Sequence, residues 1–135
     1  MSKKKPELVH TNQWLKEFFR QGCRTHRYVD AGRVDPYDGH IFVPHGPFVP
    51  FEAKFQRGGL TFNVDRWRNG LQGHQYKELI KDYERGAHAV FVVFHLPNKQ
   101  RSIEARCIKI QDLPLDRVEL KSMKIVKTIK DLLEL

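Results

Sequence analysis

An apolar run at residues 88–95, HAVFVVFH, constrains the fold more than any other segment of the chain. A strand that is apolar on both faces must lie inside a sheet that is covered on both sides. Apolar side chains recur at helical spacing over residues 76–83, and Gly86 follows at a position suited to ending that helix. A helix that leads into a buried strand connects it to an earlier strand by a right-handed crossover, so we expect those two strands to be parallel.

A hairpin pattern predicts the earlier strand. Apolar runs at residues 40–43 and 48–51 flank the turn sequence PHGP, and two such runs around proline and glycine are typical of a β-hairpin. Pro50 has no N–H, so we expect its nitrogen to face away from the partner strand unless a bulge lies there. The second hairpin strand continues through residues 51–54, FEAK, and this strand is the expected parallel partner of the buried strand.

The remaining segments complete an α/β fold. The first helix ends at Gly22 and has Trp14 at the edge of an apolar stripe made of Leu8, Leu15, Phe18 and Phe19. We expect strands at 23–29 and 102–110, a final amphipathic helix at 125–133, and a mobile, basic surface segment at 57–73. The predicted order is α-β-β-β-α-β-β-α, a mixed central β-sheet flanked by helices. The 135 residues suit a single domain, residues 1–135, with one core.

Composition favours a polyanionic partner. The chain has 24 Lys and Arg against 16 Asp and Glu, a formal charge of +8. Such an excess is typical of proteins that bind nucleic acid, and the alternative is a basic protein without such a partner. Residues 1–6 are expected to form a short basic arm that is either solvated or in contact with phosphates.

Cysteine usage and hydropathy predict a cytoplasmic protein with no membrane association. Cys23 and Cys107 lack the spacing of a metal site and suit a reduced compartment better than a disulfide framework. No apolar run approaches the ~20 residues that span a bilayer. The first residues also lack the apolar segment of a signal peptide.

Two charged side chains on the second hairpin strand carry the functional prediction. Residues two apart in a strand share a face, so Glu52 and Lys54 point one way while Phe51 and Ala53 point into the core. A carboxylate and an ammonium on a rigid strand can hold a divalent cation and a phosphate together. Lys54 would orient the attacking water or stabilise developing negative charge. The alternative is a surface ion pair, because this triplet alone is common.

Hairpin geometry decides which upstream acid joins them. Asp38 lies near the level of Glu52 if the hairpin closes around its central turn. It shares the face of Glu52 only if paired residue numbers sum to an even value, as with Phe42 opposite Phe48. Asp35 would lie roughly 10 Å farther along the strand. Asp38 is therefore the favoured metal ligand, and Asp35 is the alternate ligand or a turn residue.

Phosphodiester hydrolysis needs an activated water and neutralised phosphate charge, which one or two Mg²⁺ ions can supply. The hard oxygen ligands expected here are Asp38, Glu52 and the backbone carbonyl of Ala53, and Mn²⁺ should also be accepted. Gln75 begins the second helix, and a helix N-terminus beside a sheet can meet a phosphate or a metal-bound water. A capping or surface glutamine is the alternative. His74 is expected either to contact DNA or to be merely exposed.

Basic and aromatic residues alternate after the proposed site: Arg57, Arg66, Trp67 and Arg68. This pattern suits contact with a nucleic-acid backbone and stacking on bases. The alternative is a solvated loop with Trp67 folded onto the core. Glu7 and Glu17 on the first helix lie within possible reach of the metal, although a solvated helix face is the simpler interpretation for both.

Together these residues resemble the RecU-type Holliday junction resolvases. The resemblance is carried by FEAK at 51–54, LTF at 60–62, and GHQ at 73–75 before an amphipathic helix and a Phe/Val strand, and it covers roughly residues 35–94. These bacterial and phage enzymes belong to the PD-(D/E)xK nuclease superfamily, have a restriction-endonuclease-like core, and are close in design to the archaeal Hjc resolvases. By the matched motif, the resemblance implies four active-site residues: Asp38, Glu52, Lys54 and Gln75.

The resemblance also implies a hydrolase that acts in DNA recombination and repair or in phage DNA processing. Such an enzyme is a homodimer that binds four-way junctions and makes symmetric, Mg²⁺-dependent nicks. If the gene belongs to a phage, the protein would act in the host cytoplasm. The alternatives are a structure-selective or general DNA endonuclease with the same site, a non-catalytic DNA-binding protein, and a basic structural protein.

Overall fold

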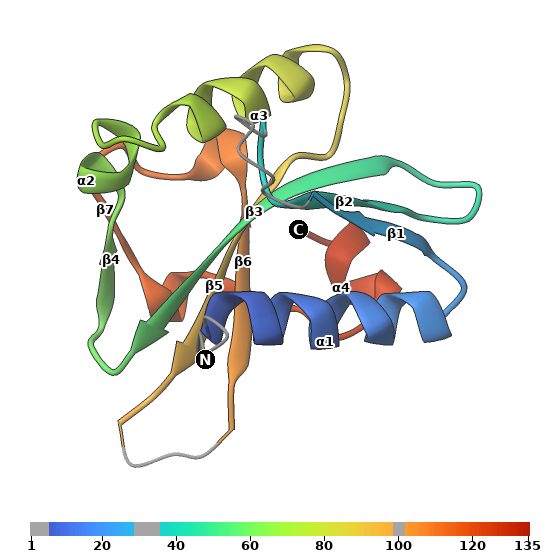
Figure 1. The fold of residues 1–135 in the computed structure, drawn as a ribbon, viewed down its shortest axis with the longest axis horizontal. Helices are drawn as coiled ribbons and strands as arrows, with labels where there is room; N and C mark the ends of the chain where they lie inside the picture. The colour runs from blue at the N-terminus through green and yellow to red at the C-terminus, as the bar shows by residue number, and fades with distance from the viewer. Residues whose placement is uncertain (1–5, 29–35, 99–101) are drawn as a thin grey trace, which may run out of the picture.

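The computed structural model describes residues 6–28, 36–98 and 102–135. Within these ranges a six-stranded sheet forms the centre of the molecule, in the order β1-β2-β3-β5-β6-β8. Its strands are β1 (Arg24–Arg27), β2 (Gly39–Phe42), β3 (Phe48–Arg57), β5 (Val90–Leu96), β6 (Glu104–Lys109) and β8 (Lys124–Ile125). The helices are α1 (Pro6–Arg20), α2 (Val64–Arg68), α3 (His74–Glu84) and α4 (Ile129–Leu133). Figure 1 shows α1 and α3 on opposite sides of the sheet, which confirms the predicted mixed α/β architecture.

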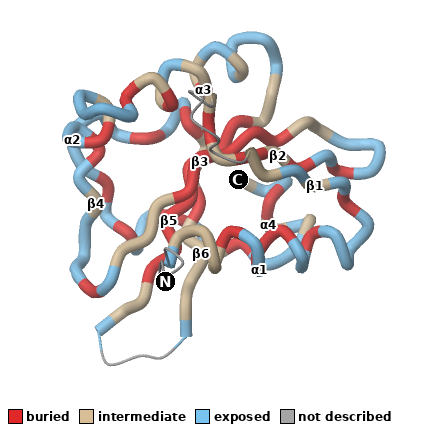
Figure 2. The backbone as a smooth tube through the Cα atoms, viewed as in Figure 1, coloured by how far each residue is buried: buried red, intermediate tan, exposed pale blue. Residues whose placement is uncertain are grey.

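The parallel pair at the centre of the sheet is confirmed. β3 and β5 run parallel, with Glu52 beside Phe91 and Lys54 beside Val93, and α3 lies in the connection between them. Six of the seven residues of β5 are buried, as Figure 2 shows for the middle of the sheet. The apolar run therefore forms a central strand because helices cover both of its faces.

The predicted hairpin is also present, with Phe42 opposite Phe48. The amide of Val43 donates to the carbonyl of Pro47, which marks that pair as hydrogen-bonded. Because hydrogen-bonded and non-hydrogen-bonded pairs alternate along an antiparallel ladder, the pair of His40 and Pro50 belongs to the second kind. The nitrogen of Pro50 therefore faces away from β2, as its missing N–H requires.

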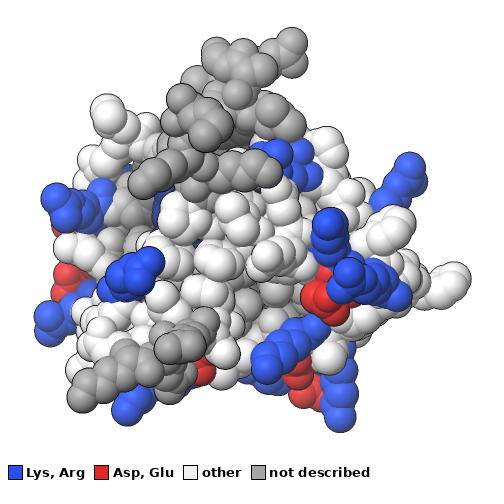
Figure 3. All heavy atoms as spheres, turned by 60° about the horizontal axis from the view of Figure 1, so that its bottom comes forward, with Lys and Arg blue, Asp and Glu red and all other residues white. Residues whose placement is uncertain are grey.

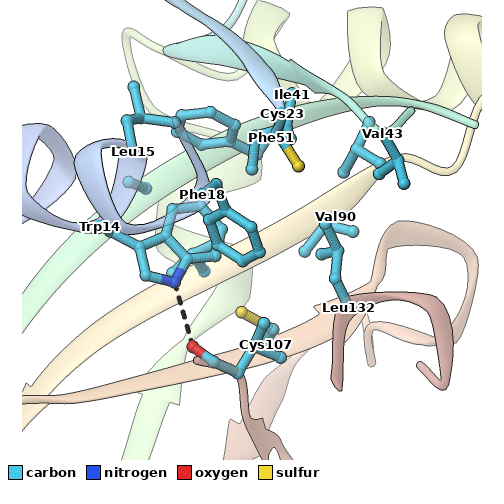
Figure 4. Packing of buried hydrophobic residues seen from close by; sticks show 14 of the residues in the cluster. Trp14, Leu15, Phe18, Cys23, Ile41, Val43, Phe51, Val90, Cys107 and Leu132 are labelled. Carbon is cyan, nitrogen blue, oxygen red and sulfur yellow. Dashed lines mark hydrogen bonds between the residues drawn. The ribbon is translucent and has the colours of Figure 1, made fainter. Parts of the chain in front are cut away.

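One hydrophobic cluster lies between α1 and the sheet (Figure 4). Trp14, only 7% exposed, packs edge-on against Phe18, Phe51 and Phe94. The predicted stripe was shifted by part of a turn, because Phe19 is 67% exposed and Trp14 takes the core position. Gly22 has a φ of 101°, which suits the glycine expected at this helix end.

Two side chains, one in α1 and one just after it, form hydrogen bonds to the last elements of the chain. The Trp14 indole N–H donates to the carbonyl of Val126, 3.1 Å away, along the dashed line in Figure 4. The Gln21 side chain donates to the carbonyl of Lys127 at 3.0 Å and accepts from the amide of Ile129 at 2.9 Å. Each contact joins segments that are far apart in sequence.

A second cluster on the other face contradicts the prediction of a mobile surface segment at 57–73. That segment contains α2 and the strand β4 (Thr61–Asn63), which pairs with β7 (Arg117–Glu119) in a small second sheet. Val64 is fully buried, and Trp67 stacks on Phe91 with ring centroids 4.7 Å apart. Asn63 caps α2 by accepting a hydrogen bond from the amide of Arg66 at 2.9 Å.

The last part of the chain differs from the predicted helix at 125–133. Two short 3-10 helices follow β6, at Ile110–Asp112 and Leu120–Ser122, and Ile125 belongs to β8. α4 begins only after Thr128, whose side chain forms a capping box with Asp131. None of the helices in the described part of the chain is long and apolar enough to cross a membrane.

Candidate active site

Glu52 and Lys54 project from the middle of β3 on the face covered by α2 and α3. The side chain of Glu52 is 1% exposed and that of Lys54 is 15% exposed, and Lys54 Nζ lies 3.1 Å from Glu52 Oε2. The predicted sharing of a face is therefore observed. The alternative of a surface ion pair is contradicted, because a solvated pair would not lie this deep in the fold.

Asp38 lies at the start of the hairpin, across from Glu52. Its amide donates to the carbonyl of Phe51 at 3.1 Å, and its carboxylate accepts from the amide of Ala53 at 2.7 Å. Gly39 pairs with Phe51, so the numbers of paired residues sum to an even value. This is the register that was expected to place Asp38 on the same face as Glu52. Asp35, the alternate ligand, lies outside the described residues.

Burial makes this acid pair electrostatically costly when both members are ionised. The pKa of Glu52 is raised well above its usual range, first by burial and second by the charge of Asp38, while Lys54 opposes the shift. Burial also raises the pKa of Asp38, against the hydrogen bond from Ala53. Neither carboxylate oxygen of Glu52 meets an aligned hydrogen-bond donor among the described residues, so the contact with Lys54 is one of charge at close distance.

A divalent cation fits this arrangement. Lys54 supplies one positive charge to two adjacent carboxylates, and the Glu52 oxygens have no aligned donor among the described residues, so a further cation is needed for both acids to ionise readily. Across residues 6–28, 36–98 and 102–135 no group of three or more His, Cys, Asp and Glu could hold a metal. The site therefore offers two carboxylates and the carbonyl of Ala53, with other positions left to water and substrate, as Mg²⁺ prefers.

The two acids of α1 differ in their relation to this pair. Glu7 lies near enough for its charge to contribute to the raised pKa of Glu52. Glu17 is paired with Arg20, and the side chains of both are more than half exposed. Nothing in the sequence distinguished Glu7 from Glu17. In the structure Glu7, and not Glu17, contributes to the raised pKa of Glu52.

Trp67 lies beside Lys54 and is joined by a hydrogen bond to Gln75 at the start of α3. Gln75, in the first turn of α3, is 8% exposed and accepts a hydrogen bond from the Trp67 indole N–H at 3.2 Å. Trp67 is 6% exposed. Its predicted role in stacking on bases is contradicted because the ring already packs against Phe91, and the alternative of a tryptophan folded onto the core is observed.

The Lys54 ammonium contacts Gln72 and Trp67 as well as Glu52. It donates to Gln72 Oε1 at 2.9 Å and lies 5.8 Å from the centre of the Trp67 ring. A groove of about 550 Å³ opens beside it, with Arg66 and Gln72 among its lining residues. Sequence reasoning missed Gln72, because a polar residue in a glycine-flanked turn gives no signal of a partner 18 positions away.

The predicted DNA-contacting residues divide into two groups. Arg57 and Arg66 are exposed. Arg68 instead donates two hydrogen bonds to the carbonyl of Leu115, at 3.1 and 3.0 Å, and its guanidinium lies 5.4 Å from the centre of the Tyr76 ring. His74 is half-buried in the first turn of α3. Figure 3 shows that Lys and Arg side chains are spread widely around the face it presents, about a central area without charged side chains.

Comparison with known proteins identifies a similar fold. No family model matches the chain, and no curated protein sequence matches it. Among solved structures, the chain is similar to that of Hjc, a Holliday junction resolvase from the hyperthermophilic archaeon Archaeoglobus fulgidus, with a TM-score of 0.62. The two are 16% identical, and the match covers 93% of this chain and 97% of that one. The chain therefore has an Hjc-like fold.

Proposed function

We propose that this protein is a metal-dependent endodeoxyribonuclease that resolves four-way DNA junctions. The buried pair of Asp38 and Glu52, with Lys54 beside it, is the observation that carries the proposal. The Hjc-like fold and the formal charge of +8 support a DNA substrate. A non-catalytic DNA-binding protein would have no use for a buried acid pair whose ionisation costs free energy.

Asp38, Glu52 and the carbonyl of Ala53 would hold Mg²⁺, with Mn²⁺ as a substitute. When bound, the ion supplies an activated water and neutralises charge on the scissile phosphate. The fixed position of Asp38 on the amide of Ala53 keeps one ligand in place before any ion arrives. Burial excludes bulk water from Glu52, so electrostatic interactions within the site are stronger than at the surface.

Lys54 would stabilise the negative charge that develops on the phosphate as its bond to the leaving oxygen breaks. Its ammonium is positioned for this by Glu52 and Gln72. Gln75, held by Trp67, would orient the attacking water from the start of α3. The resemblance to the RecU-type resolvases implies products with 5′-phosphate and 3′-hydroxyl ends.

Resolution of a junction requires two opposed nicks, and each chain contributes one candidate site. We therefore propose a homodimer that acts on junction DNA in recombination or repair, in the cytoplasm. The exposed Arg57 and Arg66 would contact the phosphates of the junction arms, together with the half-buried His74.

Cleavage of a labelled four-way junction beside a linear duplex of the same sequence, with Mg²⁺ and with EDTA, tests the proposal. Paired, symmetric nicks in the junction alone, abolished by EDTA and by Glu52→Gln, are expected. Equal cutting of both substrates would identify a general endonuclease of the same fold. Binding without cutting would reject the enzymatic proposal.

A further inference from the structure

The sheet face that carries the acid pair continues beyond α3 onto the outer strands. Alternate residues of a strand share a face, so Glu52 shares its face with Pro50 and Phe48. The register then places His40 and Phe42 of β2 on the same face, opposite Pro50 and Phe48. The candidate site and the outer strands β1 and β2 therefore present one surface.

This outer surface is an unbroken group of rings, which we call the outer aromatic face: His26, Tyr28, His40, Phe42 and Phe48. The His40 ring lies 5.1 Å from each of the His26, Phe42 and Phe48 rings, measured between centroids. Tyr28 Oη lies 3.5 Å from His40 Nδ1, and the amide of Tyr28 donates to the carbonyl of Asp38 at 2.8 Å. The rings thus begin beside the acid and extend about 13 Å along β2 to Phe42.

The outer aromatic face is open to a ligand. Phe42 is 45% exposed and His26 is exposed, while Tyr28, His40 and Phe48 are half-buried. A hollow of about 390 Å³ lies over the face, and its lining includes Arg24. A contiguous group of exposed rings marks a surface for interaction, whereas single exposed rings are common on protein surfaces.

The charge of this region selects the kind of partner. Arg24 lies on this face with His26 and Tyr28, whereas Arg27 alternates onto the opposite face, and neither β1 nor β2 contains an Asp or Glu. A symmetric contact between two copies through this face would bring the two copies of Arg24 near one another, which like-charge repulsion opposes. Rings interleaved with arginine suit nucleotides whose bases are free to stack, since the cations contact the phosphates and the rings contact the bases.

We propose that the outer aromatic face binds unpaired nucleotides of the DNA substrate, next to the candidate active site. The inference rests on the proposed function in one respect, namely that the substrate is DNA. The duplex arms of the substrate could not bind in this way, because bases that are paired and stacked in a duplex cannot stack on Phe42. The structure would therefore favour DNA with unpaired nucleotides at or near a branch point.

The test compares Phe42→Ala and Arg24→Ala with matched controls on the α1 side of the sheet. Phe19→Ala removes a ring that is 67% exposed, against 45% for Phe42, and Lys130→Ala removes an exposed cation. Fluorescence anisotropy would measure binding of a single-stranded oligothymidylate and of a blunt duplex. Each variant of the face should weaken binding to the single strand by about tenfold, with a smaller effect on the duplex and none from the controls.

Photo-crosslinking of the unaltered protein to an oligonucleotide containing 5-iodouracil keeps the test decisive even if Phe42→Ala fails to fold. Crosslinks that map to the outer aromatic face are expected, and crosslinks confined elsewhere would overturn the proposal. Unchanged affinity of Arg24→Ala and of folded Phe42→Ala for the single strand would overturn it as well. Sedimentation that shows Phe42→Ala converting a dimer to a monomer would identify the face as an interface between copies.

Junction cleavage by the unaltered protein, measured in parallel, separates the two proposals. Cleavage of the junction together with unaffected single-strand binding in the variants would reject only the outer aromatic face. Loss of single-strand binding in the variants of a protein that cuts no junction would reject only the resolvase.

Discussion

The carboxylate of Asp38 accepts a hydrogen bond from the backbone amide of Ala53, with 2.7 Å between the two heavy atoms. The bond crosses the hairpin and fixes Asp38 on the strand that carries Glu52. Both acids are withdrawn from water, and burial is the leading cause of the raised pKa of each. A bound cation would offset the free-energy cost of ionising both carboxylates.

Glu52→Gln should stabilise the metal-free protein at neutral pH. Because the folded-state pKa of Glu52 is raised, the folded state binds more protons than the unfolded chain, and stability falls as pH rises above the ordinary pKa of 4.5. The amide cannot ionise and so removes this cost, which is about 1.4 kcal/mol for each unit by which the pKa of the carboxyl is raised. Thermal unfolding in EDTA between about pH 5 and 8 would show a flatter profile than that of the parent.

Glu134→Gln provides the control for this measurement, because Glu134 is a half-exposed surface acid. Its profile should follow that of the parent. A Glu52→Gln profile that runs parallel to the parent at all pH values would contradict the electrostatic interpretation of the site.

Asp38→Asn should abolish the rise in melting temperature that Mg²⁺ causes, whereas Asp35→Asn should retain it. At an ion concentration about 100 times the dissociation constant, binding adds about 2.7 kcal/mol to the stability of the parent. Thermal unfolding with Mg²⁺ and with EDTA measures the difference without any need for DNA. The opposite ranking of the two variants would make Asp35 the ligand.

Glu7→Gln should slow junction cleavage by about twofold to tenfold, because it removes one of the negative charges that attract a cation to the acid pair. Glu7 contributes to the electrostatic environment of Glu52. Glu17→Gln is the matched control on the same helix, because Glu17 pairs with Arg20 at the surface. Initial rates at saturating Mg²⁺ provide the comparison, and equal rates for the two variants would exclude a role for Glu7.

Arg57→Ala and Arg66→Ala should each lower the salt dependence of junction binding by about one unit, as expected for the loss of one phosphate contact. Arg68→Ala should act mainly on stability instead, because its guanidinium is bound to Leu115 and packs on Tyr76. Titrations at several salt concentrations, combined with melting curves, separate the two effects. A reduced slope for Arg68→Ala with an unchanged melting temperature would reverse this assignment.

The central sheet could be predicted from the sequence because its signals are local. The turn between Val43 and Phe48 closes the hairpin in one register, and the helix before β5 leaves a parallel pair as the natural connection. The same register brought Asp38 beside Glu52, so the geometry of the acid pair followed from the position of one turn.

The second cluster could not be predicted because its partners are distant in sequence. Val64 and Trp67 are isolated apolar residues in a polar segment, and the strand that pairs with β4 lies more than 50 residues later. The contact of Lys54 with Gln72 depends on that same packing. In α1, Trp14 and Phe19 lie on opposite flanks of the stripe, and only the packed sheet decides which flank is buried.

The hydrogen bonds from α1 to the end of the chain bear on how the protein is synthesised. Trp14 and Gln21 bond to residues more than 100 positions later. A nascent chain therefore cannot complete this side of its core until translation has passed Ile129 and that residue has left the ribosome. α1 emerges well before the segment that it packs against, and until that segment arrives Trp14 and Phe18 remain available to chaperones and proteases.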